Sequence, residues 1–376
     1  MRIGFDVAQT CVERAGCAWY ADSLARALAN ELSPEDELIL YHHFGSWLNA
    51  DTAAGTQIGA TNVRMPLRKL SGREAKKVWA DPDHRLLGGP DIVHANSYRA
   101  PRVKGARLVY TIYDVSYWTV PEFSTDENRL ACQAGTLEAL QRAEGFIFIS
   151  HSAREEFDRV LPGWLSDRGV PSAVIPLGAR GGALMRAASE LAGDAYWLAV
   201  GNMEPRKNYA ALLQSIPTYR SASTHPAPIL IAGGDGWESE SLKTEIAKHE
   251  ADGSVRRLGY VKDEILESLY RNARGLIFPS WYEGFGLPVL EALARGCPVI
   301  CSDRTSLREV GGDAVQFIDP SRPESIAHAM LCLENAANIE SIRTAGRARA
   351  EQFSWSKTAR QTMEFYQRVL KSPTQD

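Results

Sequence analysis

The sequence has little of what marks a metalloprotein, a disulfide-bonded secreted protein or a membrane-spanning one. Its six cysteines form no Cys-x-x-Cys pair and have no histidines at metal-binding spacing. No stretch approaches the ~18 apolar residues of a membrane span, and the start, MRIGFDVAQT, lacks the apolar core of a signal peptide. We therefore expect reduced thiols, no metal site and a cytoplasmic protein, at most peripheral on the inner face of the plasma membrane.

The sequence also lacks a large excess of charge of either sign. Its 42 Lys and Arg residues against 46 Asp and Glu give a formal net charge of −4, which does not favour nucleic-acid binding. Hydrophobic residues at 44% and charged residues at 23% are ordinary for a globular protein. At 376 residues the chain is too long for one compact core, so two domains are expected.

Short β-rich runs alternate with helical patterns along the whole chain, which predicts an α/β protein with parallel sheets. A glycine-rich break, ARGGALMRAA, separates two such series. We predict a first Rossmann-like domain over 1–180, a second over 181–355, and an amphipathic helix over 356–376 that packs back on the first. The expected strands are RIGFDV, ELILYH, DIVHAN, RLVYTIYD, GFIFIS and SAVIPLG in the first domain, and YWLAVG, APILIAGG, SVRRLGY, GLIFPS, PVICSD and AVQFID in the second.

The segment FPSWYEGFGLPVLEALARGCPVICSD is the most informative in the chain. After an expected strand, a loop delivers Glu283 and the glycines Gly284 and Gly286 ahead of a helix in which Pro288 suits the first turn. Glycines let backbone amides approach a ligand, and a helix amino end offers free N–H groups to an anion such as a diphosphate. Glu291, about one turn into the helix, is placed to reach hydroxyl groups. A capped helix with two solvated glutamates is the simpler alternative.

A pair of cations, Arg206 and Lys207, follows the expected strand YWLAVG in the run GNMEPRKN. Cations at the end of a strand and the start of a helix are suited to hold a diphosphate and to stabilise its charge as it departs. The alternative is an ordinary solvated pair.

These segments resemble family 4 glycosyltransferases, which have the GT-B fold of two facing Rossmann-like domains with a cleft between them. The likeness covers most of the second half, from LGYVKDEILESLYRNARGLIFPS to TSLREVGGDAVQFIDP, and includes VG-x-x-EPRKN. It implies a first domain that binds the acceptor and a second that binds the donor. Glu283 would lie beside the donor hexose, with Arg206 and Lys207 as its catalytic partners. Glu291 would bind the ribose, and the segment Gly284, Phe285, Gly286 and Leu287 would contact the sugar or diphosphate.

The resemblance adds three further donor-side segments. Gly16 matches a glycine loop that closes over the donor phosphate, although Ala18 stands where relatives have a second glycine. Gly233 follows the strand PILIA and either passes the donor closely or simply forms a turn. Tyr260 and Val261 match the place where relatives hold the base, although Tyr260 is equally suited to a core.

On the acceptor side, DIVHANSYRAP and VYTIYDVSYWTVPEF resemble two strands that face the acceptor. His94, Tyr113 and Asp114 are the candidate residues. Many relatives have a histidine where Tyr113 stands, and tyrosine is a poor proton carrier at neutral pH. A lone histidine such as His94 is as readily a structural residue.

The implied activity is retaining, metal-independent transfer of a hexose from a nucleoside-diphosphate sugar to a glycan or lipid-linked acceptor, with no cofactor. The runs EPRKN and EVGGDAVQFIDP are most similar to bacterial mannosyltransferases of surface-polysaccharide synthesis, which favours GDP-mannose over a UDP-hexose. Alternatives from other classes are a sugar-nucleotide epimerase and a non-catalytic nucleotide-sugar-binding partner.

A local basic cluster stands out in the first half of this acidic chain. Six cations and one anion, Glu74, occupy fourteen residues. The cluster is suited to an anionic membrane surface or a diphosphate-linked lipid acceptor, or it is a solvated helix face. Its cations are Arg64, Arg68, Lys69, Arg73, Lys76 and Lys77.

Overall fold

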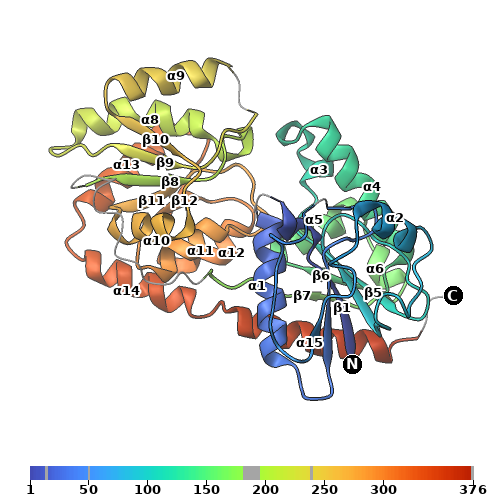
Figure 1. Ribbon diagram of the computed structural model, residues 1–376. Coiled ribbons are helices and arrows are strands. Elements are labelled where there is room, and N and C mark those ends of the chain that lie inside the picture. Colours follow the sequence, from blue (N-terminus) through green and yellow to red (C-terminus); the bar gives the residue numbers. More distant parts are fainter. Residues whose placement is uncertain (13–15, 50, 181–194, 238–239, 374–376) are drawn as a thin grey trace. The chain divides into compact units, whose positions relative to one another are not determined.

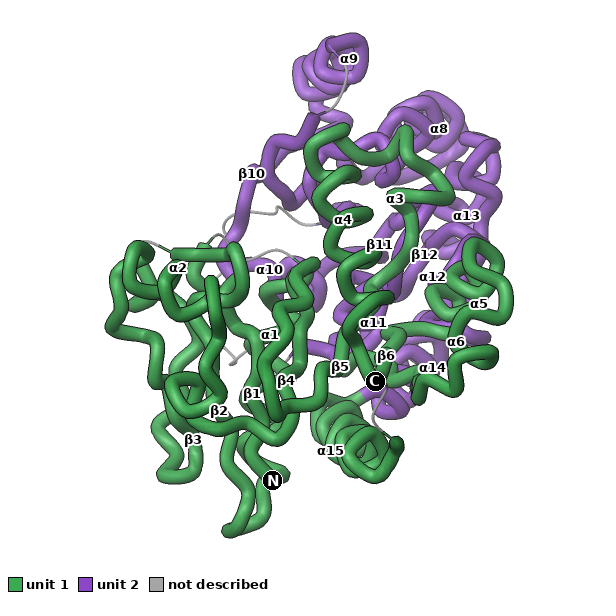
Figure 2. Tube along the Cα trace, turned by 90° about the vertical axis from the view of Figure 1, so that its right-hand side faces the viewer, with its two compact units in different colours: residues 1–178, 354–376 green, residues 179–353 purple. Residues whose placement is uncertain are grey.

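The computed structural model describes residues 1–12, 16–49, 51–180, 195–237 and 240–373. Within it the chain divides into two compact units (Figure 2). Unit 1 comprises Met1–Gly178 and Ser354–Asp376, and unit 2 comprises Ala179–Phe353. The glycine-rich break that separates the two predicted domains lies, from residue 181 onward, outside the described residues.

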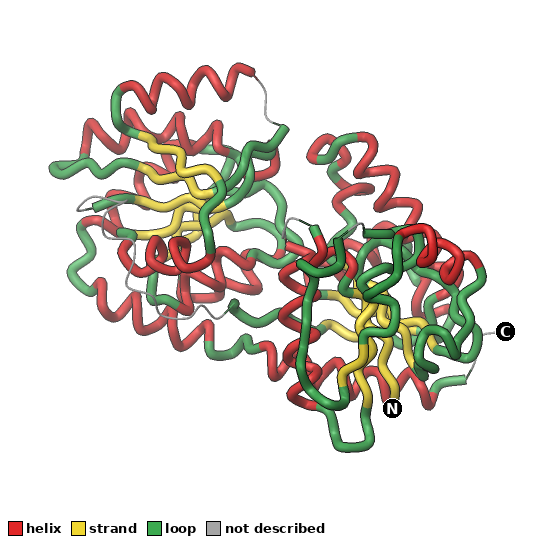
Figure 3. Tube along the Cα trace, viewed as in Figure 1, coloured by secondary structure: helices red, strands yellow, loops and turns green. Residues whose placement is uncertain are grey.

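Unit 1 is built on a seven-stranded parallel sheet in the order β3-β2-β1-β4-β5-β6-β7. Helices lie on both sides of the strands (Figures 1 and 3). The strands are β1 (Arg2–Asp6), β2 (Glu37–Tyr41), β3 (Val63–Arg64), β4 (Ile92–Ala95), β5 (Arg107–Ile112), β6 (Gly145–Phe148) and β7 (Ser172–Val174). The helices are η1 (Ala8–Cys11), α1 (Gly16–Glu31), α2 (Gly72–Ala80), α3 (Ser116–Thr119), η2 (Pro121–Phe123), α4 (Asp126–Arg142), α5 (His151–Val160), α6 (Trp164–Asp167) and α15 (Trp355–Lys371).

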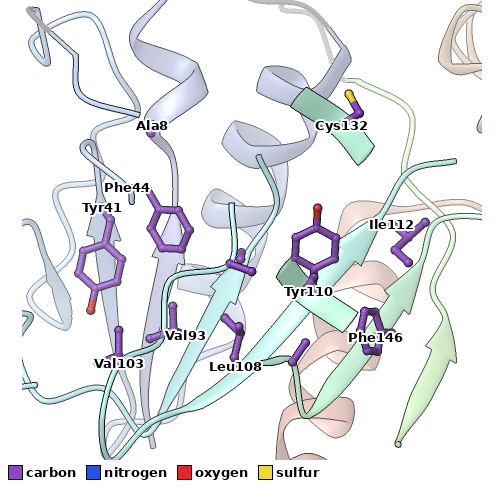
Figure 4. Packing of buried hydrophobic residues seen from close by; sticks show 14 of the residues in the cluster. Ala8, Tyr41, Phe44, Val93, Val103, Leu108, Tyr110, Ile112, Cys132 and Phe146 are labelled. Carbon is purple, nitrogen blue, oxygen red and sulfur yellow. The ribbon is translucent and has the colours of Figure 1, made fainter. Parts of the chain in front are cut away.

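An aromatic core fills one face of this sheet (Figure 4). Tyr41 and Phe44 pack edge-on against Trp79 of α2, with ring centroids 5.7 and 5.0 Å away. Tyr110 and Phe146 continue the layer along β5 and β6, 6.2 Å apart. The central strands β1, β2, β4, β5 and β6 are runs of buried residues, as in a parallel sheet covered on both faces.

The C-terminal helix α15 packs with α1 on the other face of the unit 1 sheet. Its inward side chains include Tyr366, which is fully buried. The hydroxyl of Tyr366 lies 2.6 Å from Nδ1 of His94, and Nε2 of His94 lies 2.6 Å from the Thr111 hydroxyl. Tyr20 of α1 extends the chain of hydrogen bonds to Thr111 at 3.0 Å. Four elements are therefore joined through one buried polar network.

Unit 2 is built on a six-stranded parallel sheet in the order β10-β9-β8-β11-β12-β13. Helices α8 and α13 pack together on one side, and α11 and α14 on the other (Figure 1). The strands are β8 (Trp197–Val200), β9 (Ile229–Ala232), β10 (Val255–Gly259), β11 (Gly275–Phe278), β12 (Val299–Ser302) and β13 (Gln316–Ile318). The helices are η3 (Pro205–Lys207), α8 (Tyr209–Ala222), α9 (Glu240–Ala251), α10 (Asp263–Asn272), α11 (Leu287–Ala294), α12 (Ser306–Gly311), η4 (Gly312–Ala314), α13 (Pro323–Glu334) and α14 (Ile339–Ala350).

Each strand expected from the sequence is present in the sheets. The sequence analysis missed β3, whose two residues are too short to leave a pattern. Within the described part of the chain, no helix combines the length and the apolar character needed to cross a membrane.

The buried network predicts how the stability of unit 1 depends on pH. Burial lowers the pKa of His94 from 6.5 to about 3. The unfolded chain therefore binds a proton at His94 that the folded chain excludes, so the contribution of His94 to stability is full above about pH 6.5 and falls as the pH drops toward 3. For one group the loss is about 2 kcal/mol between pH 6.5 and 5.

We expect His94→Asn to lower the stability at pH 7.5 and to flatten its decline toward pH 5, measured by urea unfolding. The control is His225→Asn, because His225 is exposed and its loss should leave the slope unchanged. An unaltered slope in His94→Asn would contradict the role of this network.

Candidate functional site

Two loops of unit 2 meet at the carboxyl edge of its sheet, because β8 and β11 are adjacent parallel strands. The loop after β8 carries Arg206, whose carbonyl accepts a 2.8 Å hydrogen bond from the amide of Trp281 in the loop after β11. Asn208, held at φ +56°, donates through its side-chain amide to the carbonyl of Pro279 at 3.1 Å. These bonds fix the predicted cationic pair against the predicted glycine loop.

The centre of the site is a buried carboxylate held by two cations. Lys207 Nζ donates to Oε1 of Glu283 at 2.7 Å, and Arg206 donates to Oε2 at 2.9 Å. Only 8% of the side chain is exposed in both Glu283 and Lys207, whereas 29% is exposed in Arg206. The Lys207 ammonium also lies 4.6 Å from the centre of the Phe278 ring. The sequence placed these three residues in one site, and the structure brings them into contact.

Burial and neighbouring charges shift the pKa values of Glu283 and Lys207. Burial works against ionisation of Glu283, yet the cations Lys207 and Arg206 hold its pKa below the ordinary 4.5. Burial, together with repulsion from Arg206, lowers the pKa of Lys207 from 10.5. Glu283 is therefore an ionised hydrogen-bond acceptor at neutral pH, with a compact positive charge beside it.

The backbone of Glu283 is fixed by the loop that follows β12. Its amide donates to the Thr305 hydroxyl at 3.1 Å, and its carbonyl accepts from the Ser306 hydroxyl at 2.8 Å. Thr305 has φ +46°, a left-handed conformation that is uncommon for a β-branched residue. Such strain is maintained when the surroundings demand it, and here it directs a hydroxyl at the loop that carries Glu283.

The glycine loop turns into α11 at Gly286, which caps the helix with φ +97°. A side chain there would be strained and would meet Leu307 at 2.6 Å, so glycine is required. Pro288 lies in the first turn, as expected. Phe285 is buried and packs edge-on against Phe353 with ring centroids 6.0 Å apart. These contacts fix the amino end of α11 next to Gly284 and Leu287, and a helix amino end offers free N–H groups.

Glu291, on α11, is 2% exposed and is bound by Arg180 and Tyr270. Nε of Arg180 donates to Oε1, and the other arm of the guanidinium donates to Oε2 at 3.0 Å. The Tyr270 hydroxyl donates to Oε2 at 3.1 Å. Glu291 is therefore a buried, neutralised carboxylate rather than an exposed helix residue.

The remaining donor-side candidates lie in separate loops. Gly233 allows its own backbone to approach that of Gly201, since a Cβ at residue 233 would lie 2.1 Å from the Gly201 carbonyl oxygen. Tyr260 is 59% exposed after β10 and is not part of the core, and Val261 is half-buried. Gly16 begins α1 in unit 1, where a Cβ would meet no atom within 4 Å.

The acceptor-side candidates occupy different surroundings in unit 1. His94 is buried with both ring nitrogens bonded to Tyr366 and Thr111, so it is placed as a structural residue. Tyr113 is 7% exposed and lies 5.3 Å from the Tyr20 ring, and burial raises its pKa well above 10.0. Asp114 accepts from the amide and the hydroxyl of Ser116 at 2.9 and 2.7 Å, which starts α3. The three residues do not form one cluster of hydrogen bonds.

Sequence reasoning missed four residues that hold the site: Arg180, Tyr270, Thr305 and Ser306. Arg180 stands alone at the edge of the glycine-rich break, and Tyr270 looks like any apolar position of an amphipathic helix. Thr305 and Ser306 fall in the run TSLREVGG, which was noted only for its resemblance. Among the residues that the structure describes, no group of three or more His, Cys, Asp or Glu is placed to hold a metal ion.

The chain is similar in sequence to known glycosyltransferases. The family described as "Glycosyl transferases group 1" matches residues 184–349. The O-antigen chain mannosyltransferase B of Escherichia coli is 34% identical over 300 residues, which is 77% of each chain. The serotype-specific mannosyltransferase WbdA of Escherichia coli is 30% identical over 249 residues, 63% of this chain but 30% of that longer protein.

Solved structures show the same fold at low sequence identity. Sucrose-phosphate synthase from Thermosynechococcus elongatus is 19% identical, covers 98% of both chains and has a TM-score of 0.72. HepE of Anabaena, solved in complex with UDP and glucose, is 17% identical over 97% of this chain and 98% of its own, with a TM-score of 0.66. The predicted GT-B fold class, with two Rossmann-like parallel-sheet units, is confirmed.

The buried cluster predicts an uneven response to loss of its two cations. Lys207→Met leaves the ionised Glu283 with Arg206 as its remaining cation, so we expect unfolding free energy to fall by about 3 kcal/mol in urea titrations. Arg206→Met should cost about 1 kcal/mol, because that guanidinium is more exposed. Adding Glu283→Gln to Lys207→Met should restore part of the loss. Equal losses in both single variants, or no recovery in the double variant, would contradict the pairing.

Proposed function

The chain belongs to the glycosyl transferases group 1 family and is a glycosyltransferase, and from this premise we propose that it is a retaining, metal-independent hexosyltransferase of family 4. The proposed reaction moves mannose from GDP-mannose to a glycan or lipid-linked acceptor in surface-polysaccharide synthesis. The 34% identity to an O-antigen mannosyltransferase over 77% of the chain supports mannose as the sugar. A UDP-hexose is the second candidate donor, since HepE, of the same fold, was solved with UDP and glucose.

The cluster of Glu283, Lys207 and Arg206 is the observation that carries the proposal. It joins one buried acceptor to two cations at the amino end of α11. In the proposed site the helix end and the cations bind the donor diphosphate, and the ionised Glu283 orients the hexose through its hydroxyls. Glu291 binds the ribose.

The proposed chemistry needs no nucleophile on the protein. The bond between the sugar and the diphosphate breaks, the acceptor hydroxyl adds to the same face of the sugar, and its proton passes to the departing diphosphate. Lys207 and Arg206 stabilise the charge that develops on the leaving group, which is where preorganised cations are most effective.

A transfer assay tests this function. The chain is incubated with GDP-mannose or UDP-glucose, an octyl mannoside as acceptor, and an excess of chelator. We expect released GDP and a product with the anomeric configuration of the donor, seen by mass spectrometry and NMR. Glu283→Gln should slow turnover by about 10²-fold or more.

Other outcomes of the same assay separate the alternatives. An epimerised sugar nucleotide would indicate an epimerase, and nucleotide binding without turnover would indicate a binding partner. Activity that is lost in chelator and restored by Mg²⁺ or Mn²⁺ would overturn metal independence.

We further propose that a basic surface on unit 1, made of Arg64, Arg68, Lys69, Arg73, Lys76 and Lys77, binds anionic lipid. Helix α2 buries Ala75 and Trp79 and leaves Arg73, Lys76 and Lys77 exposed. Its one acid, Glu74, is engaged in a capping box with Ser71. Arg64 pairs with Glu37 at 3.2 Å, so the net positive charge comes from the other five.

We expect the chain to bind vesicles containing anionic phospholipid at low salt, measured by co-sedimentation. Each cation near such a surface contributes about 1 kcal/mol, so Lys76→Glu with Lys77→Glu should weaken binding by about tenfold or more. The matched control reverses two exposed lysines of unit 2, Lys243 and Lys248, and should bind as the original does. Equally weakened vesicle binding in both variants would show that the basic surface does not bind anionic lipid specifically.

A further inference from the structure

Most hydrogen-bond acceptor positions of the Glu291 carboxylate are occupied by donors from the protein. A carboxylate offers about four acceptor positions. Arg180 occupies one on each oxygen, and the Tyr270 hydroxyl occupies a second on Oε2. With the side chain 2% exposed, little of it faces solvent. A ribose offers two neighbouring hydroxyl donors, so it needs more acceptor positions than the occupied carboxylate has left.

Arg180 is the partner that can leave. Tyr270 is fully buried in α10, whereas the Arg180 side chain is 19% exposed and comes from the second residue of unit 2. A second carboxylate already binds the same guanidinium, because Arg180 donates to Oδ1 of Asp263 at 3.4 Å, and the Asp263 side chain is 46% exposed. The Arg180 carbonyl accepts from Arg295 at 2.6 Å, which holds the backbone in place while the side chain turns.

We propose that Arg180 is a donor-site residue that competes with the nucleotide ribose for Glu291 and is held by Asp263 alone when the donor binds. This inference rests on the proposed binding of the ribose by Glu291. In the free protein the guanidinium neutralises a buried carboxylate that would otherwise be costly to keep charged. In the bound protein the ribose hydroxyls replace the guanidinium on Glu291, and Asp263 remains as the partner of Arg180. The affinity for the nucleotide therefore depends on how readily the ion pair between Arg180 and Glu291 opens.

Calorimetric titration with GDP and with UDP tests this exchange on the full chain. We expect Arg180→Ala to bind the preferred nucleotide about fivefold more tightly. In this variant Glu291 is free to bind the ribose without first breaking its ion pair with Arg180. In a Glu291→Ala background the same substitution should have no effect. Binding by Arg180→Ala that is unchanged or weaker than that of the original would overturn the proposal.

Substitution of Asp263, the second carboxylate that binds Arg180, provides an independent test. Asp263→Asn removes the second carboxylate, so nucleotide binding should weaken about threefold, and this loss should vanish when Arg180→Ala is added. The matched control is Glu264→Gln, an exposed neighbour in the same first turn of α10. Equal losses of nucleotide affinity in Asp263→Asn and Glu264→Gln would overturn the role of Asp263.

The same experiments separate this inference from the proposed function. If Arg180→Ala melts at a markedly lower temperature, Arg180→Lys keeps the charge, breaks the two-armed contact and should show a smaller gain. An original chain that binds neither GDP nor UDP would overturn the donor site and the exchange together. Binding by the original with no gain in either Arg180 variant would overturn the exchange alone.

Discussion

The need to neutralise the buried carboxylate of Glu283 constrains the site more than any other interaction. A charge that is 8% exposed is tolerated only with close partners, and Lys207 and Arg206 supply them at 2.7 and 2.9 Å. To meet that demand the loop after β8 must lie against the loop after β11, and the loop after β12 must fix the backbone of Glu283. The strained φ of Thr305 accompanies the hydrogen bond that its hydroxyl accepts from the amide of Glu283.

The two glutamates of the glycine-loop segment are neutralised in different ways, and this difference has a chemical consequence. Glu283 is bound by two cations, and one of them, Arg206, also pairs with Glu204 at 2.8 Å, so the formal charges of this cluster balance. Glu291 is matched by the single guanidinium of Arg180 and a hydroxyl. One carboxylate thus belongs to a permanent cluster, and the other is held by a pair that a ligand with hydroxyl donors can open.

One buried polar network of unit 1 attaches the C-terminal helix. His94 lies within β4 rather than after it, so its side chain is directed by the strand alternation toward α15, where Tyr366 meets it. The sequence could place His94 near the end of a strand but could not reveal which face it occupies. Asp114 begins a helix through Ser116, and Tyr113 lies among aromatic rings. Arg73, Lys76 and Lys77 of the basic surface are exposed because Ala75 and Trp79 take the buried positions of α2, a short amphipathic helix.

The sequence by itself determined the alternation of strands and helices, the parallel sheets and the loops that carry Glu283, Arg206 and Lys207. These are local properties, since apolar periodicity, glycine and proline are read within a few residues. Tertiary structure alone decided that Arg180 and Tyr270 bind Glu291, that Thr305 and Ser306 hold Glu283, and that His94 joins α15. Each of these contacts joins residues far apart in the chain or directs a side chain to one face of a strand. Hydrogen bonds of this kind depend on distances of a few ångströms, which no spacing in a sequence specifies.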